Sequence, residues 1–192
     1  MSVMTATDSV GIPHGRPFTV DDLEAMPDDG NRYELIDGML VVSPAPGARH
    51  QKMVTKLTVA LDTACPADLH VFAAPFAVRT STSTELQPDV LVARDEDLTE
   101  KLLPVAPVLA VEVLSPSSVI NDLNNKKAAY ERMGVASYWV VDPQQPSITV
   151  FELADGRYQQ VSEVKDGDVL EVERPFPVRV TPRDLLGTLA TS

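Results

Sequence analysis

One apolar run, Val108–Leu114, limits the folds open to this chain more than any other segment. A continuous stretch of valine, leucine and alanine, closed by Ser115-Pro116, is typical of a strand buried on both faces of a sheet. Glu112 breaks the pattern by placing a carboxylate inside the run. A buried, ionised carboxylate costs several kcal/mol unless a metal ion, a cation or hydrogen bonds compensate it. The fold must therefore supply a partner for Glu112.

Length and composition indicate one globular domain. The chain has 192 residues, of which 44% are hydrophobic and 23% are charged. No apolar stretch reaches the ~20 residues of a membrane helix, and no basic segment followed by an apolar core marks a secretory signal. A single cysteine, Cys65, cannot form an internal disulfide, which fits a reducing compartment. We therefore expect a cytoplasmic protein without a membrane segment.

The charge balance excludes one class of protein. The formal net charge is −12, whereas a protein that coats nucleic acid should be basic. Any contact with nucleic acid must then be confined to a local basic patch, with help from a bound divalent cation. Solubility alone is the simpler explanation of the acidity.

The first half of the chain predicts helices and a hairpin. Residues 1–17 show little pattern and are expected to form a loose arm. Thr19, with Asp22 three residues later, resembles a capping box that opens a short helix. Two apolar segments on either side of Asp37-Gly38 predict a hairpin over 33–42. A stripe of apolar residues at helical spacing predicts a long helix over 47–64.

The second half alternates strands with one more helix. The predicted strands are 71–78 with a bulge or edge position at Pro75, 89–93, 108–114, 138–141 and 148–153. A helix over 121–133 is expected to end at Gly134. The chain closes with β-structure around 158–173 and a short helix opened by Thr181-Pro182.

This order of elements predicts an α/β or α+β fold, with a mixed central sheet and helices on both faces. Residues 18–192 are expected to form one domain, in which 155–192 are a β-rich extension. The fold class therefore combines an N-terminal hairpin, a mixed sheet flanked by helices and a C-terminal β-rich part.

Three residues in the middle of the chain could carry chemistry. Asp89 opens one predicted strand, and Glu112 lies within the next one. At about 100° per residue, Lys126 shares a helix face with Tyr130 and Met133. Because that face is apolar, we expect Lys126 to point toward the sheet, and Lys127 to flank it.

Two carboxylates on neighbouring strands can converge on a divalent cation. Oxygen ligands of this kind suit Mg²⁺ or Mn²⁺, completed by waters and a backbone carbonyl. A nearby lysine could then stabilise negative charge or orient a water. From spacing alone, a buried ion pair between Glu112 and Lys126 is the commoner arrangement, and both interpretations stay open.

The order of several short motifs resembles the Uma2 family of endonuclease-like proteins. The resemblance runs from about Thr19 to Leu153. It is carried by the following segments: Tyr33-Glu34-Leu35-Ile36-Asp37-Gly38, Gln87-Pro88-Asp89-Val90, Val111-Glu112-Val113-Leu114-Ser115-Pro116-Ser117, then Asp122, Lys126 and Tyr130, Gly134-Val135, and Tyr138-Trp139-Val140-Val141-Asp142.

The resemblance implies a restriction-endonuclease-like fold and membership of the PD-(D/E)xK nuclease superfamily. Asp89 matches the aspartate of the superfamily's Pro-Asp, and Glu112 matches its second acid. Leu114 stands where the superfamily usually has lysine, and Lys126 on the following helix takes that role instead. By the same resemblance Asp89 and Glu112 would hold Mg²⁺ or Mn²⁺, with the Val113 carbonyl as a third ligand.

Further residues are candidates for supporting roles. Glu34 matches a glutamate of the family and could assist, whereas its plain alternative is an outward strand carboxylate. His50 lies on the apolar face of the long helix, so it either looks into the site or is a satisfied core histidine. Tyr130 is an accessory candidate, although a core role is simpler. A possible nucleic-acid contact is formed by Arg49, Lys52 and Lys56, which a solvated helix edge explains equally well.

The resemblance implies hydrolysis of a nucleic-acid phosphodiester, with DNA as the expected substrate, by a metal-activated water. The alternative is a non-catalytic module that uses the same fold for protein interaction or regulation. The sparse basic surface favours the module, whereas the intact set of Asp89, Glu112 and Lys126 opposes it. A homodimer is an option, because two copies of the site could address two strands.

Overall fold

The structure is a computed structural model that describes residues 15–115 and 121–191. Side chains are described for the same residues except 121–123 and 191. Most of the expected arm over 1–17 lies outside the described residues, as do Pro116 and Ser117 and the side chain of Asp122.

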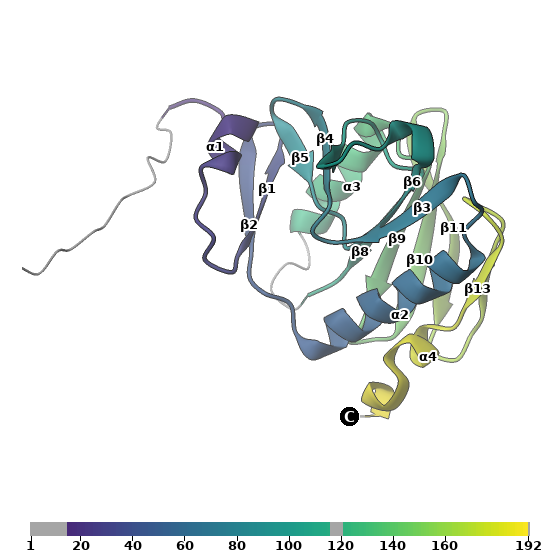
Figure 1. The fold of residues 1–192 in the computed structure, drawn as a ribbon. Helices are drawn as coiled ribbons and strands as arrows, with labels where there is room; N and C mark the ends of the chain where they lie inside the picture. The colour runs from purple at the N-terminus through teal and green to yellow at the C-terminus, as the bar shows by residue number, and fades with distance from the viewer. Residues whose placement is uncertain (1–14, 116–120, 192) are drawn as a thin grey trace, which may run out of the picture.

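The largest sheet within the described residues has six strands and forms the centre of the fold (Figure 1). Its order is β11-β10-β9-β8-β6-β3, with β8 and β9 parallel and the other pairs antiparallel. The bounds of its strands are β3 (Leu69–Ala73), β6 (Val90–Arg94), β8 (Leu109–Val113), β9 (Ser137–Asp142), β10 (Ser147–Ala154) and β11 (Arg157–Lys165).

A second sheet in the described part of the chain has the order β2-β1-β5-β4-β7. Its strands are β1 (Arg32–Ile36), β2 (Met39–Ser43), β4 (Ala77–Ser81), β5 (Thr84–Leu86) and β7 (Leu102–Leu103). A small pair, β12 (Leu170–Val172) and β13 (Val178–Val180), follows near the C-terminus. The fold is therefore of the mixed α+β class that the element order predicts.

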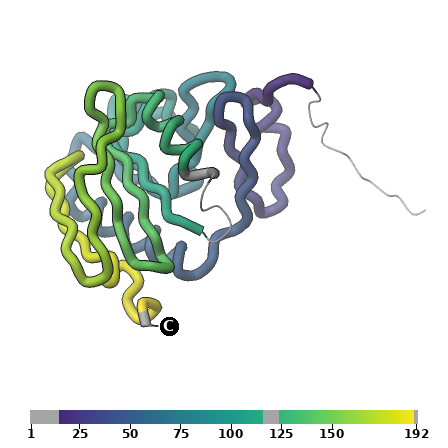
Figure 2. Tube along the Cα trace, turned by 180° about the vertical axis from the view of Figure 1, so that it is seen from behind, coloured from purple at the N-terminus to yellow at the C-terminus, as the bar shows by residue number. Residues whose placement is uncertain are grey.

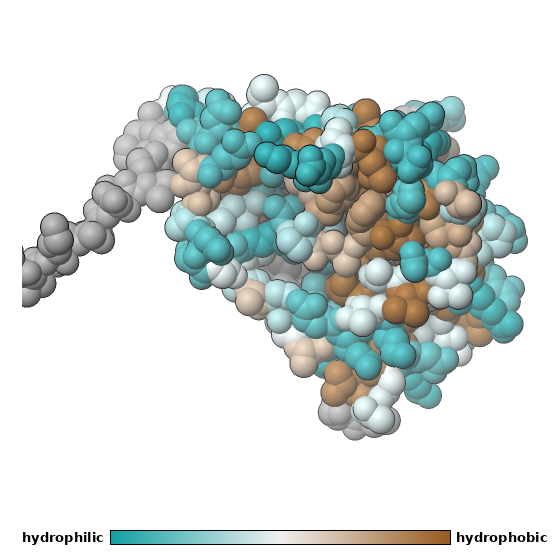
Figure 3. Space-filling model, in the orientation of Figure 1, coloured by the Kyte–Doolittle hydropathy of each residue, from teal (hydrophilic) through white to brown (hydrophobic). Residues whose placement is uncertain are grey.

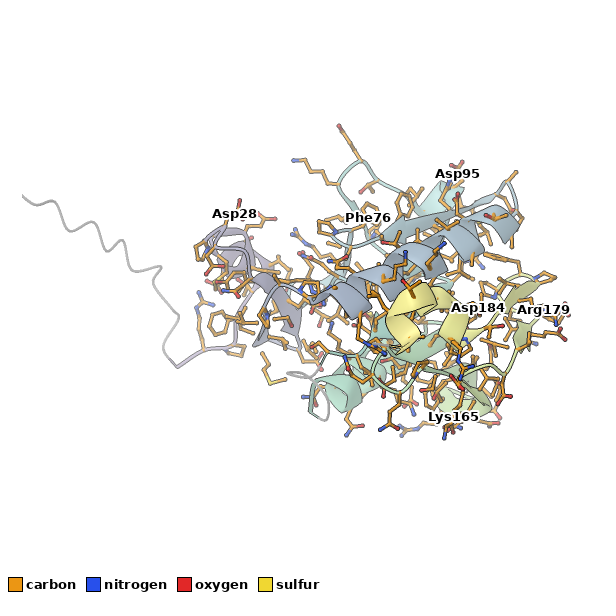
Figure 4. All side chains as sticks on the ribbon, turned by 90° about the horizontal axis from the view of Figure 1, so that it is seen from below. Asp28, Phe76, Asp95, Lys165, Arg179 and Asp184 are labelled. Atoms are coloured by element: carbon orange, nitrogen blue, oxygen red, sulfur yellow. The ribbon has the colours of Figure 1, made fainter. Side chains whose placement is uncertain are left out.

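Helices cover both faces of the six-stranded sheet. The long helix α2 (Ala48–Ala64) crosses one face, and α3 (Asn121–Met133) lies on the other, as the view from behind shows (Figure 2). The short helices are α1 (Val20–Glu24) before the hairpin and α4 (Pro182–Leu186) against α2, and two 3₁₀ segments, η1 (Asp95–Asp97) and η2 (Gly187–Thr191), complete the set. Asp28 lies at one end of the molecule, and Arg179 and Lys165 lie at the other (Figure 4).

The apolar run forms β8, and all five residues of this strand are buried, as predicted. Its side chains alternate between two cores. Leu109, Val111 and Val113 pack with α2, whereas Ala110 packs with residues of α3. Glu112 has the parity of Ala110 and therefore points to the α3 side of the sheet.

The hairpin and its turn also follow the prediction. β1 and β2 pair from Arg32 opposite Ser43 to Ile36 opposite Met39. Asp37 and Gly38 both have positive φ, at 49° and 80°, which is the signature of a type I′ turn. The turn fixes the register that places alternate residues of β1 on one face.

The prediction of a single strand over 71–78 is wrong. The chain forms β3 up to Ala73, passes through a cis peptide bond at Ala74-Pro75, and enters β4 at Ala77 in the other sheet. Proline has no N–H to donate to a sheet ladder, so Pro75 ends the strand where a bulge was expected. The segment thus links the two sheets.

Of the helices in the described residues, none combines the length and the hydropathy of a membrane-spanning segment.

Candidate active site

A cavity of about 590 Å³ lies where the N-terminal hairpin meets the six-stranded sheet. The surface is hollowed between the part formed by α1, β1 and β2 and the rest of the molecule (Figure 3). Residues from both sheets line this cavity, together with the first turns of α2 and one residue of α3. The charged and imidazole side chains in its lining are Glu24, Asp28, Arg32, His50, Glu85, Asp89, Glu112 and Lys126.

Asp89 lies immediately before β6 and is only 2% exposed. Its Oδ1 accepts a hydrogen bond from Arg32 Nη1 at 2.9 Å. Its Oδ2 accepts the backbone N–H of Val113 at 2.8 Å and lies 3.1 Å from Nε2 of His50. Burial alone would raise the pKa of Asp89, but the hydrogen bond from His50 and the charge of Arg32 lower it to about 2. Asp89 is therefore ionised at neutral pH.

Glu112 is brought beside Asp89 by strand register. β6 and β8 run antiparallel with Val90 opposite Val111, so Asp89 and Glu112 are the next positions along the ladder. Tyr130 donates its hydroxyl to Oε1 of Glu112 at 2.7 Å. Burial raises the pKa of Glu112 to about 7, against the charge of Lys126, which lowers it. The carboxylate is thus held near its titration point at neutral pH.

Lys126 is the cation that compensates the buried carboxylate of Glu112. Its Nζ lies 3.2 and 3.1 Å from Oε1 and Oε2 of Glu112. The same ammonium lies 2.9 and 2.8 Å from the two carboxylate oxygens of Glu34. Burial alone would lower the pKa of Lys126, but the charges of Glu112 and Glu34 raise it above its usual range. Lys126 is therefore a protonated, inward lysine, as its place on the helix predicts.

Glu34 belongs to the other sheet and is fully buried. Besides Lys126, it accepts the backbone N–H of Gln87 at 2.8 Å through Oε1. The outward strand carboxylate, weighed as the plain alternative for Glu34, does not occur. Instead, Glu34 and Lys126 join the hairpin to α3 beside β8.

Arg32 is the residue of this site that the sequence reasoning missed. It lines the cavity from β1 and pairs with Asp89, and its Nε lies 3.7 Å from Oε2 of Glu34. A signal was available, because Arg32 directly precedes the predicted hairpin, and extending the strand by one residue places Arg32 on the same face as Glu34. Strand parity therefore associates Arg32 with any site that contains Glu34.

His50 and Tyr130 both contact carboxylates of the site. His50 is 6% exposed and its Nε2 faces Asp89, so it is a core histidine that also lines the cavity. Tyr130 is fully buried, packs against Tyr138 with ring centroids 5.3 Å apart, and bonds Glu112. Both are therefore buried side chains that contact carboxylates of the candidate site, and their accessory roles stay predictions.

The three basic residues suggested as a nucleic-acid contact lie elsewhere. Arg49, Lys52 and Lys56 are absent from the described lining of the cavity. Arg49 donates instead to the backbone carbonyls of Pro143 and Leu189. Lys56 borders a separate hollow beside Arg179. None of the three therefore lines the cavity that contains Asp89 and Glu112.

The donor set fits a magnesium-like ion with few protein ligands. Among the described residues, no three histidine, cysteine, aspartate or glutamate side chains converge as a metal centre. Mg²⁺, however, commonly uses one or two carboxylates and keeps several waters. Asp89 and Glu112 supply two such carboxylates at adjacent ladder positions, and Val113 lies beside them in the cavity wall.

Comparison with known proteins agrees with this architecture. The model of the Uma2 family, described as "Putative restriction endonuclease", matches residues 20–186. The crystal structure of "a putative nuclease belonging to DUF820" from Anabaena variabilis has a TM-score of 0.74 at 18% identity, and the match covers 90% of this chain and 99% of that chain. The similarity shows a shared fold. A search of curated proteins finds no match.

Proposed function

Because the chain belongs to the Uma2 family, we propose that it is a metal-dependent endonuclease of the PD-(D/E)xK type. The reaction is hydrolysis of a nucleic-acid phosphodiester bond, in which water adds to phosphorus and one ester P–O bond breaks. Family membership and the nuclease-like fold support a nuclease role. The metal dependence and the residue roles are inferred from the site.

One observation carries the proposal. Two carboxylates from neighbouring strands, Asp89 and Glu112, line the same cavity as a buried, protonated lysine. Three carboxylates face only two permanent cations in this cluster, since Glu34, Asp89 and Glu112 surround Arg32 and Lys126. An additional cation would offset the remaining negative charge.

Asp89 and Glu112 would hold Mg²⁺ or Mn²⁺, with the Val113 carbonyl as a further oxygen donor. A divalent ion bound there supplies charge neutralisation and lowers the pKa of a bound water. His50 and the Val113 N–H orient the Asp89 carboxylate, and Tyr130 orients that of Glu112. Both acids are thus fixed by neighbours before substrate arrives.

Lys126 acts as an electrostatic stabiliser in this scheme. Its raised pKa keeps the ammonium protonated, so it cannot serve as the base that takes a proton from water. A fixed positive charge in a buried site stabilises the negative charge that develops on the phosphate. Glu34 holds the other side of the ammonium and keeps it beside Glu112.

A non-catalytic interaction module remains the second candidate, and one observation favours it. Arg32 and Lys126 already form ion pairs with the carboxylates of the cluster, and buried ion pairs of this kind also occur as structural features. The two candidates differ in metal binding and turnover, so one comparison separates them.

The test compares the wild type with Asp89→Asn on single- and double-stranded DNA and RNA, in Mg²⁺, Mn²⁺ or chelator. Asp28→Asn is the matched control, because Asp28 lines the same cavity outside the cluster. We expect Asp89→Asn to lower cleavage on the order of a hundredfold or more and chelator to abolish it. Cleavage that is unaffected by chelator and by Asp89→Asn would refute the metal site. No cleavage, together with no Mn²⁺ binding by calorimetry, would favour the interaction module.

A further inference from the structure

Arg32 combines two properties that no other described side chain of the cavity lining has. Its side chain is positively charged at all pH values of interest, and it is 25% exposed. Lys126, the other permanent cation of the lining, is only 6% exposed and is enclosed by Glu34 and Glu112. Arg32 is therefore the cation that a ligand entering the cavity can reach.

In the present state this cation is engaged with Asp89. Nη1 of Arg32 lies 2.9 Å from Oδ1 of Asp89 and 3.3 Å from the carbonyl oxygen of Gln87. Oδ2 of Asp89 already accepts from Val113 and faces His50. Oδ1 is thus the oxygen of Asp89 that a metal ion would use, and Arg32 occupies it.

A divalent cation and a guanidinium cannot share this carboxylate oxygen at close range. Two like charges about 4 Å apart repel by several kcal/mol in a partly buried site. A metal ion held by Oδ1 of Asp89 would therefore displace Arg32 from this oxygen. The other ionised neighbour of Arg32, Glu34, lies farther away at 3.7 Å and already pairs with Lys126.

We propose that Arg32 exchanges partners, neutralising Asp89 in the metal-free protein and binding a phosphate of the substrate once Asp89 holds a metal ion. The inference rests on the proposed function, because it needs a metal ion at Asp89. The planar guanidinium matches two phosphate oxygens. The other charged side chains of the described lining, Glu24, Asp28 and Glu85, are carboxylates and cannot take that role. In this exchange the metal ion binds before Arg32 contacts the phosphate.

The first test measures Mn²⁺ affinity by calorimetry, without any substrate. Arg32→Gln removes the competitor for Asp89, so we expect Mn²⁺ to bind roughly three- to tenfold more tightly than to the wild type, as the loss of a like charge near the ion predicts. Arg32→Lys keeps the charge and should stay close to the wild type. Thermal unfolding of each variant checks that it is folded.

Arg79→Gln is the matched control. Arg79 is also 25% exposed, and it pairs with Glu24 and Glu85 of the cavity lining but not with Asp89. Its loss should leave Mn²⁺ affinity within about twofold of the wild type. Equal or weaker Mn²⁺ binding by Arg32→Gln would overturn the exchange while leaving the metal site intact. Mn²⁺ binding in none of the proteins, or binding that persists in Asp89→Asn, would overturn the proposed metal site and the exchange together.

The second test measures binding of a fluorescent single-stranded DNA oligonucleotide by anisotropy. Ca²⁺ takes the same oxygen donors and serves as the probe ion. The wild type should bind at least about tenfold more tightly with Ca²⁺ than with chelator, and Arg32→Gln should lose most of that gain. Arg32→Gln should therefore bind metal more tightly and DNA more weakly than the wild type. These opposite changes distinguish an arginine that exchanges partners from one with a structural role alone. Metal-independent DNA binding that is unchanged in Arg32→Gln would contradict the proposal.

Discussion

The polar cluster between the two sheets illustrates how single residues set the properties of a site. Lys126 forms ion pairs with two buried carboxylates, those of Glu34 and Glu112. Arg32 pairs with Asp89 and also lies near Oε2 of Glu34. Removing one member leaves an uncompensated charge, which is costlier than the net value of the pair. Each substitution here therefore affects stability and chemistry at once, so assays need a stability measurement beside them.

Glu112→Gln should change how stability depends on pH. In the metal-free protein the pKa of Glu112 is about 7, against an ordinary 4.5, because burial disfavours its charged form. A carboxyl whose pKa is raised by folding stabilises the native state below pH 4.5 and loses that contribution as pH rises through 7. We expect the wild type to lose on the order of 1–3 kcal/mol relative to Glu112→Gln across this window.

Urea unfolding at several pH values in chelator measures this difference. Glu171→Gln is the control, since the Glu171 side chain is 70% exposed and distant from the cluster. A constant difference between the wild type and Glu112→Gln from pH 4.5 to 8 would contradict the raised pKa.

Much of the residue-level arrangement follows from sequence periodicity. The helical periodicity predicts that Lys126 points inward, and the apolar run around Glu112 predicts that Glu112 is buried; both side chains are buried in the structure. Their functional roles stay predictions. The ion pair between Lys126 and Glu34 could not be predicted from the sequence, because it depends on how the hairpin packs against α3. Arg32 was not predicted, because the family resemblance includes Glu34 but not the arginine two residues before it.

At the scale of elements, the hairpin β1–β2 depends on one glycine. Gly38 has φ of +80°, and a Cβ added there would lie 2.5 Å from Cβ of Pro17. An alanine at this position would strain the turn and displace Pro17. We expect Gly38→Ala to lower the free energy of unfolding by about 1–3 kcal/mol, measured by chemical denaturation.

Gly167→Ala serves as the comparison. Gly167 lacks a positive φ, and a Cβ there would meet nothing within 4 Å. This substitution should leave stability unchanged or raise it by up to about 1 kcal/mol through the unfolded chain. If both variants behave alike, Gly38 does not constrain the turn.

Elements with strong periodicity were predictable, and those that change sheets were not. The helices α2 and α3 and the strand β8 lie where their patterns predict. The segment around Pro75 was read as one strand because apolar residues flank the proline, although the two halves pair in different sheets. Local pattern gives no information on which sheet a strand joins. The hairpin β4–β5 (Ala77–Leu86) was also missed, since its serine and threonine residues resemble a loop.

At the scale of the whole molecule, the acidic charge limits how nucleic acid can bind. The net charge is −12, and Arg32 and Lys126 are the lysine and arginine side chains in the described cavity lining. Each phosphate neutralised on single-stranded DNA contributes about −0.7 to the slope of log K against log salt. One phosphate contact at Arg32 predicts a slope of roughly −0.7 for the Ca²⁺-loaded protein, and a second contact at the buried Lys126 would bring it to about −1.4.

Anisotropy titrations in KCl from about 50 to 200 mM provide that slope. Arg32→Gln should make it shallower by about one phosphate contact. A slope of about −4 or steeper would show that basic residues outside the cavity, such as Lys52 and Lys56, also contact the strand.

The position of the ion pairs between the two sheets has a consequence for variation and engineering. The Arg32–Asp89 pair joins the hairpin to the central sheet, and the Lys126–Glu34 pair joins it to α3. The proposed turnover requires at least the first of these pairs to open. Substitutions that strengthen these ion pairs are expected to raise thermal stability and, under the proposed mechanism, to slow cleavage. Under the proposed mechanism, high stability and fast turnover would therefore favour different substitutions at these positions.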